Sequence, residues 1–176
     1  MFGKMQIISL PAFAVFALGA ATTGALAPAH GDIDGVKNAM SIYLEDVARA
    51  EADGFINTVE CVVDEEGRGA MGVHLINLGR MQDPAVTANE PEALLFEPTK
   101  DGMRLRGVEY FVSLGEAGAP IPDNPPPAPT LFGQKFHGSM AGHSPQMPPH
   151  YDLIVWFDNP DGTFEIFNRN VSCPAE

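Results

Sequence analysis

The sequence predicts a single α+β domain in which one N-terminal amphipathic helix packs on a mostly antiparallel β-sheet. Three observations support this fold class. Apolar residues recur at spacings of three and four between residues 33 and 47, the apolar period shortens to two from Phe55 onward, and turn residues separate the short apolar segments that follow. We find no internal repeat, so residues 30–176 are predicted to form one domain.

The first 29 residues have the layout of a secretory signal peptide. Lys4 supplies a positive start, residues 7–20 form an apolar run, and small residues continue to Ala29. Cleavage after Ala27 or after Ala29 fits the Ala-x-Ala pattern, and the proline that follows Ala27 favours the second site. We therefore expect export to the periplasm or the extracellular space, with a mature chain that starts at His30. An uncleaved membrane anchor is the alternative.

The excess of acidic over basic residues disfavours negatively charged binding partners. The chain has 23 acidic and 10 basic residues and a formal net charge of −13. Such a surface repels phosphate backbones and anionic membranes, so we expect no nucleic-acid partner. Solubility outside the cytoplasm explains the acidity, and attraction of cations is the functional alternative.

Cys61 and Cys173 are the two cysteines of the chain. In an exported protein an isolated pair predicts a disulfide bond. A zinc site is disfavoured, because zinc takes four ligands and neither cysteine has a second cysteine near it in sequence. The predicted bond joins the C-terminal end of the domain to an early strand.

The predicted helix starts at Asp32 or Asp34, either of which can cap its first turn. Gly54 is placed to end it in a left-handed conformation. Its apolar stripe consists of Ile33, Val36, Met40, Tyr43, Leu44 and Val47.

Six segments after the helix read as strands. Lys100-Asp101-Gly102 predicts a hairpin between the third and fourth, and the turn at residues 158–162 predicts another between the fifth and sixth. The fifth carries large apolar residues on both faces, so we expect it to be central. The segments are residues 55–63, 71–78, 94–97, 103–112, 151–157 and 163–167.

A proline- and glycine-rich region spans about residues 115–149. Proline cannot complete a sheet ladder, so we expect loops here. The apolar residues between Leu131 and Phe136 predict an island that docks on the core. Residues 115–129 could instead present an extended proline-rich face to a protein partner, which makes an interaction module one possible function.

The chain contains a set of short blocks in a fixed order: Gly72-Val73-His74, residues 91–98 (PEALLFEP), Gly107-Val108-Glu109-Tyr110, Leu131-Phe132-Gly133-Gln134, Tyr151 with Trp156, and Asn159-Pro160 to Val171-Ser172-Cys173. This ordered set resembles a family of small exported bacterial proteins whose activity is uncharacterised. The resemblance implies export and a shared fold, not a reaction. That family carries a histidine two positions before the tryptophan that matches Trp156, where this chain has Ile154.

The loop before the fifth strand segment is rich in histidine and methionine. Imidazole and thioether groups are ligands that copper prefers, so the loop predicts a copper site. The alternative is a polar loop with solvated histidines and methionines that cap the core. At a mature N-terminus, His30 could add a second copper ligand set. The candidate ligands of the loop are His137, Met140, His143, Met147 and His150.

His74 lies in the middle of a predicted strand and is the best candidate for a buried titrating group. With Glu97 or Glu109 it could perform acid–base catalysis in a small extracytoplasmic enzyme. The alternatives are a hydrogen-bonded core histidine and cross-strand ion pairs of the glutamates. Asp152, Asp158 and Asp161 lack the spacing of a calcium loop, so we interpret them as part of a turn.

Taken as a whole, the sequence favours an exported domain that binds a small ligand or a metal ion near the proline-rich loops. An enzyme that uses His74 and a protein-interaction module are the two alternatives. No Gly-x-Ser-x-Gly nucleophile motif occurs in the chain.

Overall fold

The structure, a computed structural model, describes residues 32–174, except for the side chains of residues 58 and 59. The predicted signal peptide, its cleavage site and His30 lie outside the described residues. The helices are α1 (Ile33–Met40), α2 (Val47–Ala52) and two short 3-10 helices, η1 (Ser41–Tyr43) and η2 (Arg80–Gln82). The strands are β1 (Phe55–Val63), β2 (Ala70–Asn77), β3 (Ala93–Thr99), β4 (Gly102–Ser113), β5 (Thr130–Leu131), β6 (Gln134–Lys135), β7 (His137–Met140) and β8 (His150–Trp156).

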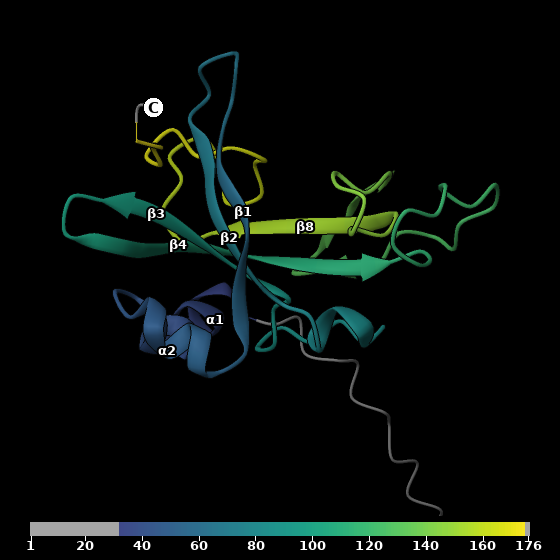
Figure 1. Ribbon diagram of the computed structural model, residues 1–176, viewed down its shortest axis with the longest axis horizontal. Helices are drawn as coiled ribbons and strands as arrows, with labels where there is room; N and C mark the ends of the chain where they lie inside the picture. Colours follow the sequence, from purple (N-terminus) through teal and green to yellow (C-terminus); the bar gives the residue numbers. More distant parts are fainter. Residues whose placement is uncertain (1–31, 175–176) are drawn as a thin grey trace, which may run out of the picture.

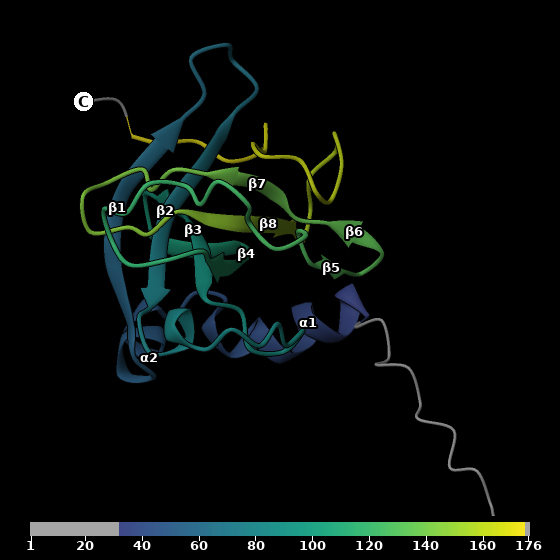
Figure 2. The same cartoon turned by 90° about the vertical axis from the view of Figure 1, so that its right-hand side faces the viewer.

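Six of these strands form one antiparallel sheet in the order β1-β2-β3-β4-β8-β7, and β5 and β6 form a separate small hairpin. The helices lie on one side of the sheet and the C-terminal segment lies on the other (Figures 1 and 2). The prediction of a mostly antiparallel sheet is confirmed, and the described residues form a few short helices beside it. The five strand segments predicted between residues 55 and 157 all occur, with ends shifted by a few residues, and β8 lies inside the sheet with all its residues buried.

The helical layer is interrupted, unlike the single helix that the sequence pattern predicts. After η1 the Asp46 side chain accepts a hydrogen bond from the Arg49 amide at 2.9 Å and starts a new helix, α2. The carbonyl of Leu44 at the break accepts a hydrogen bond from the Leu105 amide of β4 at 2.8 Å. Leu44 therefore leaves the apolar stripe and is 49% exposed. Gly54 follows α2 with a φ of 91°, the left-handed conformation expected of it.

Two apolar clusters pack against opposite faces of the sheet. The larger one joins α1, η1 and α2 to the inner face of the sheet. The smaller one lies on the outer face, where the C-terminal segment covers it, and consists of Ala70, Leu95, Ile154, Trp156 and Val171. The inner face of the sheet is therefore covered by the helical layer, and part of its outer face is covered by the C-terminal segment.

Residues 163–167 do not form the predicted sixth strand. Both edges of β8 are already used, by β4 and by β7. The segment is held instead by Trp156, whose indole N–H donates to the Glu165 carbonyl at 2.8 Å. Further along, the backbone of Asn168 bonds to Ala70 in both directions. Gly69 permits this approach, because a Cβ at residue 69 would overlap the Asn168 carbonyl.

The proline-rich region is mostly irregular, as expected, but it is attached to the domain. Phe136 is buried in the core, so the predicted apolar island does dock. The Tyr151 hydroxyl donates to the Pro126 carbonyl at 2.8 Å, and the Phe136 amide donates to the Pro129 carbonyl at 3.0 Å. Strand β7 was predicted as loop, because Gly138 and Ser139 give it no apolar period.

The Cys61–Cys173 disulfide is present, with 5.6 Å between the two Cα atoms. It ties the C-terminal segment to the edge strand β1. Among residues 32–174, no helix is long and apolar enough to cross a membrane.

Replacement of both cysteines by serine should lower the free energy of unfolding by roughly 4–5 kcal/mol, because the bond closes a loop across 112 residues. Chemical denaturation of the mature protein measures the change. A loss below about 1 kcal/mol would show that the C-terminal segment is held by its other contacts.

Candidate functional site

The outer face of the sheet carries a row of buried polar side chains. Side chains alternate between the two faces of a strand. Val108 and Tyr110 of β4 and Leu153 of β8 belong to the inner core, so Glu109 and Asp152 point to the outer face. The same alternation places His74 of β2 and His150 of β8 on that face, among apolar neighbours that include Ile154. Four titratable side chains from three strands thus share one largely dry surface.

His74 and Glu109 approach each other at the centre of this face. Nε2 of His74 lies 3.6 Å from Oε2 of Glu109. The two side chains are therefore in contact, but the distance is longer than that of a hydrogen bond. The two residues are 5% and 6% exposed. Burial lowers the pKa of His74 to about 4 and raises the pKa of Glu109 to about 8, so both are neutral at pH 7. The structure thus brings together one of the two His–Glu pairs expected from the sequence.

Glu97, the other glutamate considered as a partner of His74, lies elsewhere. Its carboxylate accepts hydrogen bonds from the amide and the hydroxyl of Ser172 at 3.2 Å, and it lies 3.7 Å from Nε of Arg106. It anchors the C-terminal segment and is no partner for His74. Asp158 and Asp161 lie in the turn after β8, in agreement with their interpretation as turn residues, and form ion pairs with Arg106 of β4 and with Arg169.

Two buried acids have surroundings that were not expected from the sequence. They are Asp152 of the polar row and Glu92, which precedes β3 and lines a separate groove with Arg80. Burial raises the pKa of Glu92 to about 7, and its carboxylate accepts a hydrogen bond from the Phe111 amide at 2.9 Å. Burial also raises the pKa of Asp152. Asp152 is part of β8 rather than the turn after it. The sequence could have indicated the burial of Asp152, because this acid lies inside a segment that carries large apolar residues on both faces.

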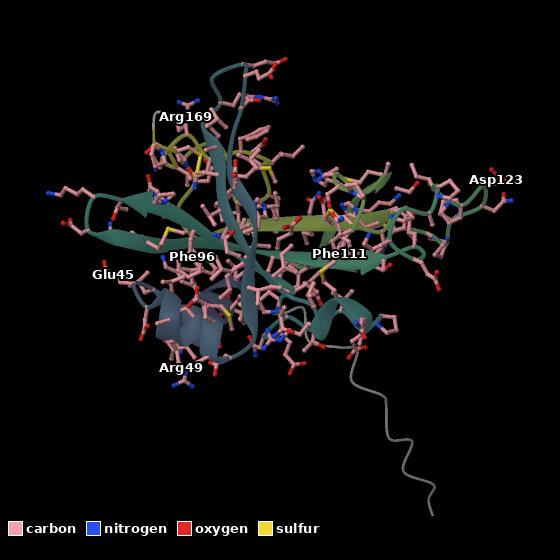
Figure 3. The ribbon with its side chains drawn as sticks, in the orientation of Figure 1. Glu45, Arg49, Phe96, Phe111, Asp123 and Arg169 are labelled. Atoms are coloured by element: carbon pink, nitrogen blue, oxygen red, sulfur yellow. A yellow bond between two sulfur atoms is a disulfide. The ribbon has the colours of Figure 1, made fainter. Side chains whose placement is uncertain are left out.

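His150 is the most constrained of the loop histidines. It is 0% exposed and stacks on Phe111 with 4.3 Å between ring centroids; Figure 3 labels Phe111 on β4, close to where the loops before β8 gather. Nδ1 lies 2.9 Å from the Pro148 carbonyl. A carbonyl only accepts, so Nδ1 carries the proton and Nε2 holds a lone pair. That Nε2 atom is buried and has no hydrogen-bond partner among the described residues.

His143 links the loop to the row of buried groups. Its ring centroid lies 5.2 Å from that of His150. It also lies close enough to influence the pKa of His74, His150 and Asp152, always as a smaller effect than burial. The histidine-rich loop and the His74–Glu109 pair, which the sequence presented as separate candidates, therefore occupy one region of the outer face.

The remaining predicted metal ligands lie on β7 and in the loop. His137 is the cross-strand partner of Asp152, and Met140 is the cross-strand partner of His150. Met147 lies in the loop, where its backbone packs against Gly142. Between residues 32 and 174, no three His, Cys, Asp or Glu side chains are assembled in metal-binding geometry. His137, Met140, His143 and His150 lie near one another at the β7–β8 end of the sheet. Coordination of one ion by them would require the loop to move toward β8.

A depression of about 410 Å³ lies beside this cluster and is lined by His143 and its loop neighbours. It gives His143 access to solvent. The tight course of the loop depends on Gly142, because a Cβ at that position would overlap the carbonyl oxygen of Met147.

Substitution of Glu109 by glutamine should change the pH dependence of stability. The pKa of Glu109 rises from its ordinary value of 4.5 to about 8 on folding, so wild-type stability falls as the pH rises through this range. Glutamine does not titrate. The stability of Glu109→Gln relative to wild type should therefore rise from pH 5 to pH 8, by up to about 1.4 kcal/mol per pH unit.

Chemical denaturation at a series of pH values measures this difference, and the exposed Glu116→Gln provides the control. The lowered pKa of His74 acts below pH 6.5 in both proteins and cancels in the comparison to the extent that its pKa does not depend on Glu109. A difference that stays constant with pH would contradict a buried, neutral Glu109.

Comparison with known proteins adds no identity to this geometry. No family model, curated protein sequence or solved structure matches the chain.

Proposed function

We propose that the protein is an extracytoplasmic copper-binding domain and that its site lies at the β7–β8 end of the outer face. The signal-peptide pattern of residues 1–29 and the Cys61–Cys173 bond support a location outside the cytoplasm. The family resemblance also implies export. The net charge of −13 favours the approach of cations over anions.

The observation that carries the proposal is the state of His150. Histidines that bind metals donate one ring N–H to a carbonyl or carboxylate, which fixes the ring and leaves the other nitrogen free to coordinate. His150 has this arrangement, with Nδ1 bonded to Pro148 and a free Nε2. A buried nitrogen without a partner costs free energy, and a bound cation removes that cost.

The neighbours of His150 supply further donors of a kind that suits copper. His143 lies beside it, Met140 lies across the strand pair, and His137 and Asp152 form the next cross-strand pair. Copper(II) binds imidazole and carboxylate groups most tightly among the common divalent ions, and copper(I) also accepts thioethers. We expect loop residues 141–149 to move inward when the ion binds.

The contact between His74 and Glu109 favours an acid–base enzyme as the second candidate. Within residues 32–174, neither residue lines one of the better-formed grooves. Ile154 is the cross-strand partner of Glu109. It stands where the resembled family carries histidine, and here it supplies no third polar group.

Isothermal titration with copper(II) tests the proposal. The mature protein should bind one ion per chain with sub-micromolar affinity. His150→Phe should weaken this binding at least tenfold, because it keeps an aromatic ring stacked on Phe111 and removes the nitrogen. The titration is repeated in a His30→Ala background, since an N-terminal histidine chelates copper by itself. Equal affinity of wild type and His150→Phe in that background would contradict the proposed site.

The conformation of the loop gives a second prediction. Gly142→Ala should weaken copper binding at least tenfold, because the added Cβ forces the loop away from His150. The far-UV circular dichroism of the domain should remain unchanged. Gly115→Ala is the matched control, since a Cβ there makes only ordinary contacts. Unchanged copper affinity in Gly142→Ala would show that the course of the loop does not matter for the site.

A further inference from the structure

A second candidate binding site lies on the opposite side of the sheet, between the helical layer and β4. It is a groove of about 340 Å³. Leu44, Leu105 and Phe157 give it an apolar lining, and Figure 3 labels Glu45 beside it, where the helical layer meets the β3–β4 hairpin. The other lining residues are Lys37, Ser41, Glu45, Arg104, Arg106 and Asp158.

The interruption of the helical layer exposes apolar surface at this groove. The Leu44 carbonyl is held by the Leu105 amide at 2.8 Å, which turns the Leu44 side chain out of the core. Leu44 is 49% exposed, and Phe157 is half-buried. A continuous helix would have placed Leu44 against the sheet, so the apolar surface of the groove results from the break.

Lys37 supplies a cation that forms no ion pair within residues 32–174. Its Nζ lies 3.4 Å from the Phe157 carbonyl, and no described carboxylate lies within 4.0 Å of it. The two arginines of the lining are already paired, Arg104 with Glu45 and Arg106 with Asp158, each at 3.0 Å. The groove therefore has one cation available to a ligand, on the surface of a chain with 23 acids and 10 bases.

We propose that this groove binds a small amphiphilic carboxylate, free in solution, with its carboxylate at the Lys37 ammonium group and its hydrocarbon part on Leu44, Leu105 and Phe157. The single positive charge of Lys37 matches the single negative charge of a carboxylate ligand. Phosphorylated ligands are disfavoured, because Glu45 and Asp158 at the rim repel a second charge. The volume lies at the low end of the range for small-molecule sites, about 300–1,000 Å³, which suits a medium-chain acid.

The copper proposal and this one are independent, because the two sites use different residues on opposite faces of the sheet. Titration calorimetry with octanoate, below its micelle concentration, tests the carboxylate site, with 1-octanol as the uncharged comparison. Octanoate should bind the wild-type mature protein at one molecule per chain and at least tenfold more tightly than octanol.

Two variants separate the charge from the apolar contact. Lys37→Met keeps the aliphatic stem and should weaken octanoate binding at least tenfold while octanol binding is unchanged. Leu44→Ser should weaken the binding of both ligands. Lys135→Met, on the separate β5–β6 hairpin, is the matched control and should leave both affinities unchanged. Lys37 and Leu44 are both exposed, so the variants should retain the wild-type far-UV spectrum.

The backbone amides provide a readout that does not depend on the variants. In two-dimensional ¹H–¹⁵N spectra, octanoate should shift the amide signals of Leu105 and Phe157 and leave that of Asp152 in place. The absence of octanoate binding at millimolar concentration would overturn the proposal, and so would equal octanoate affinity in wild type and Lys37→Met.

Discussion

The pairing of β4 with β8 is the constraint on which the rest of the structure depends. The two strands align from Gly107 opposite Trp156 to Ser113 opposite His150, and their central residues are buried on both faces. Every second residue of each strand must then face away from the helices. Glu109, Asp152 and His150 are forced by this register into surroundings that disfavour their charged forms. A shift by one residue would exchange this polar set with the apolar set of the inner core.

This register concentrates titratable groups where a small domain gains little stability from them. Buried imidazoles and carboxyls lose hydration, and His74 and His150 each keep a ring nitrogen without a hydrogen-bond partner among the described residues. Perturbed groups of this kind gather at functional sites more often than elsewhere. The C-terminal segment, held by Cys173 and Trp156, covers one end of the outer face, and the histidine-rich loop flanks the other. The second end is therefore where a ligand can reach the buried row.

The sequence was informative where local patterns decide the structure. Strands with a period of two and an isolated pair of cysteines predicted the sheet and the disulfide correctly. It was uninformative where distant segments meet. Nothing near His143 in the sequence indicates how close its ring lies to that of His150. The pairing of His137 with Asp152 depends on β7, which has no apolar period. The break in the helical layer was missed because the cap at Asp46 outweighs a stripe that continues through it. Residues 163–167 were misassigned because their pattern cannot show that both edges of β8 are taken.

The proposed copper site requires that His150 is a buried imidazole with a protonated Nδ1 and a free Nε2. Long-range ¹H–¹⁵N NMR of the histidine rings in the mature protein measures this directly. Because burial lowers its pKa, His150 should keep the Nδ1–H form as the pH falls past the range where a solvated imidazole takes up a proton. One equivalent of copper(I) should shift its Nε2 signal. A His150 ring that carries its proton on Nε2, or that titrates like a solvated imidazole near pH 6.5, would contradict the proposed site.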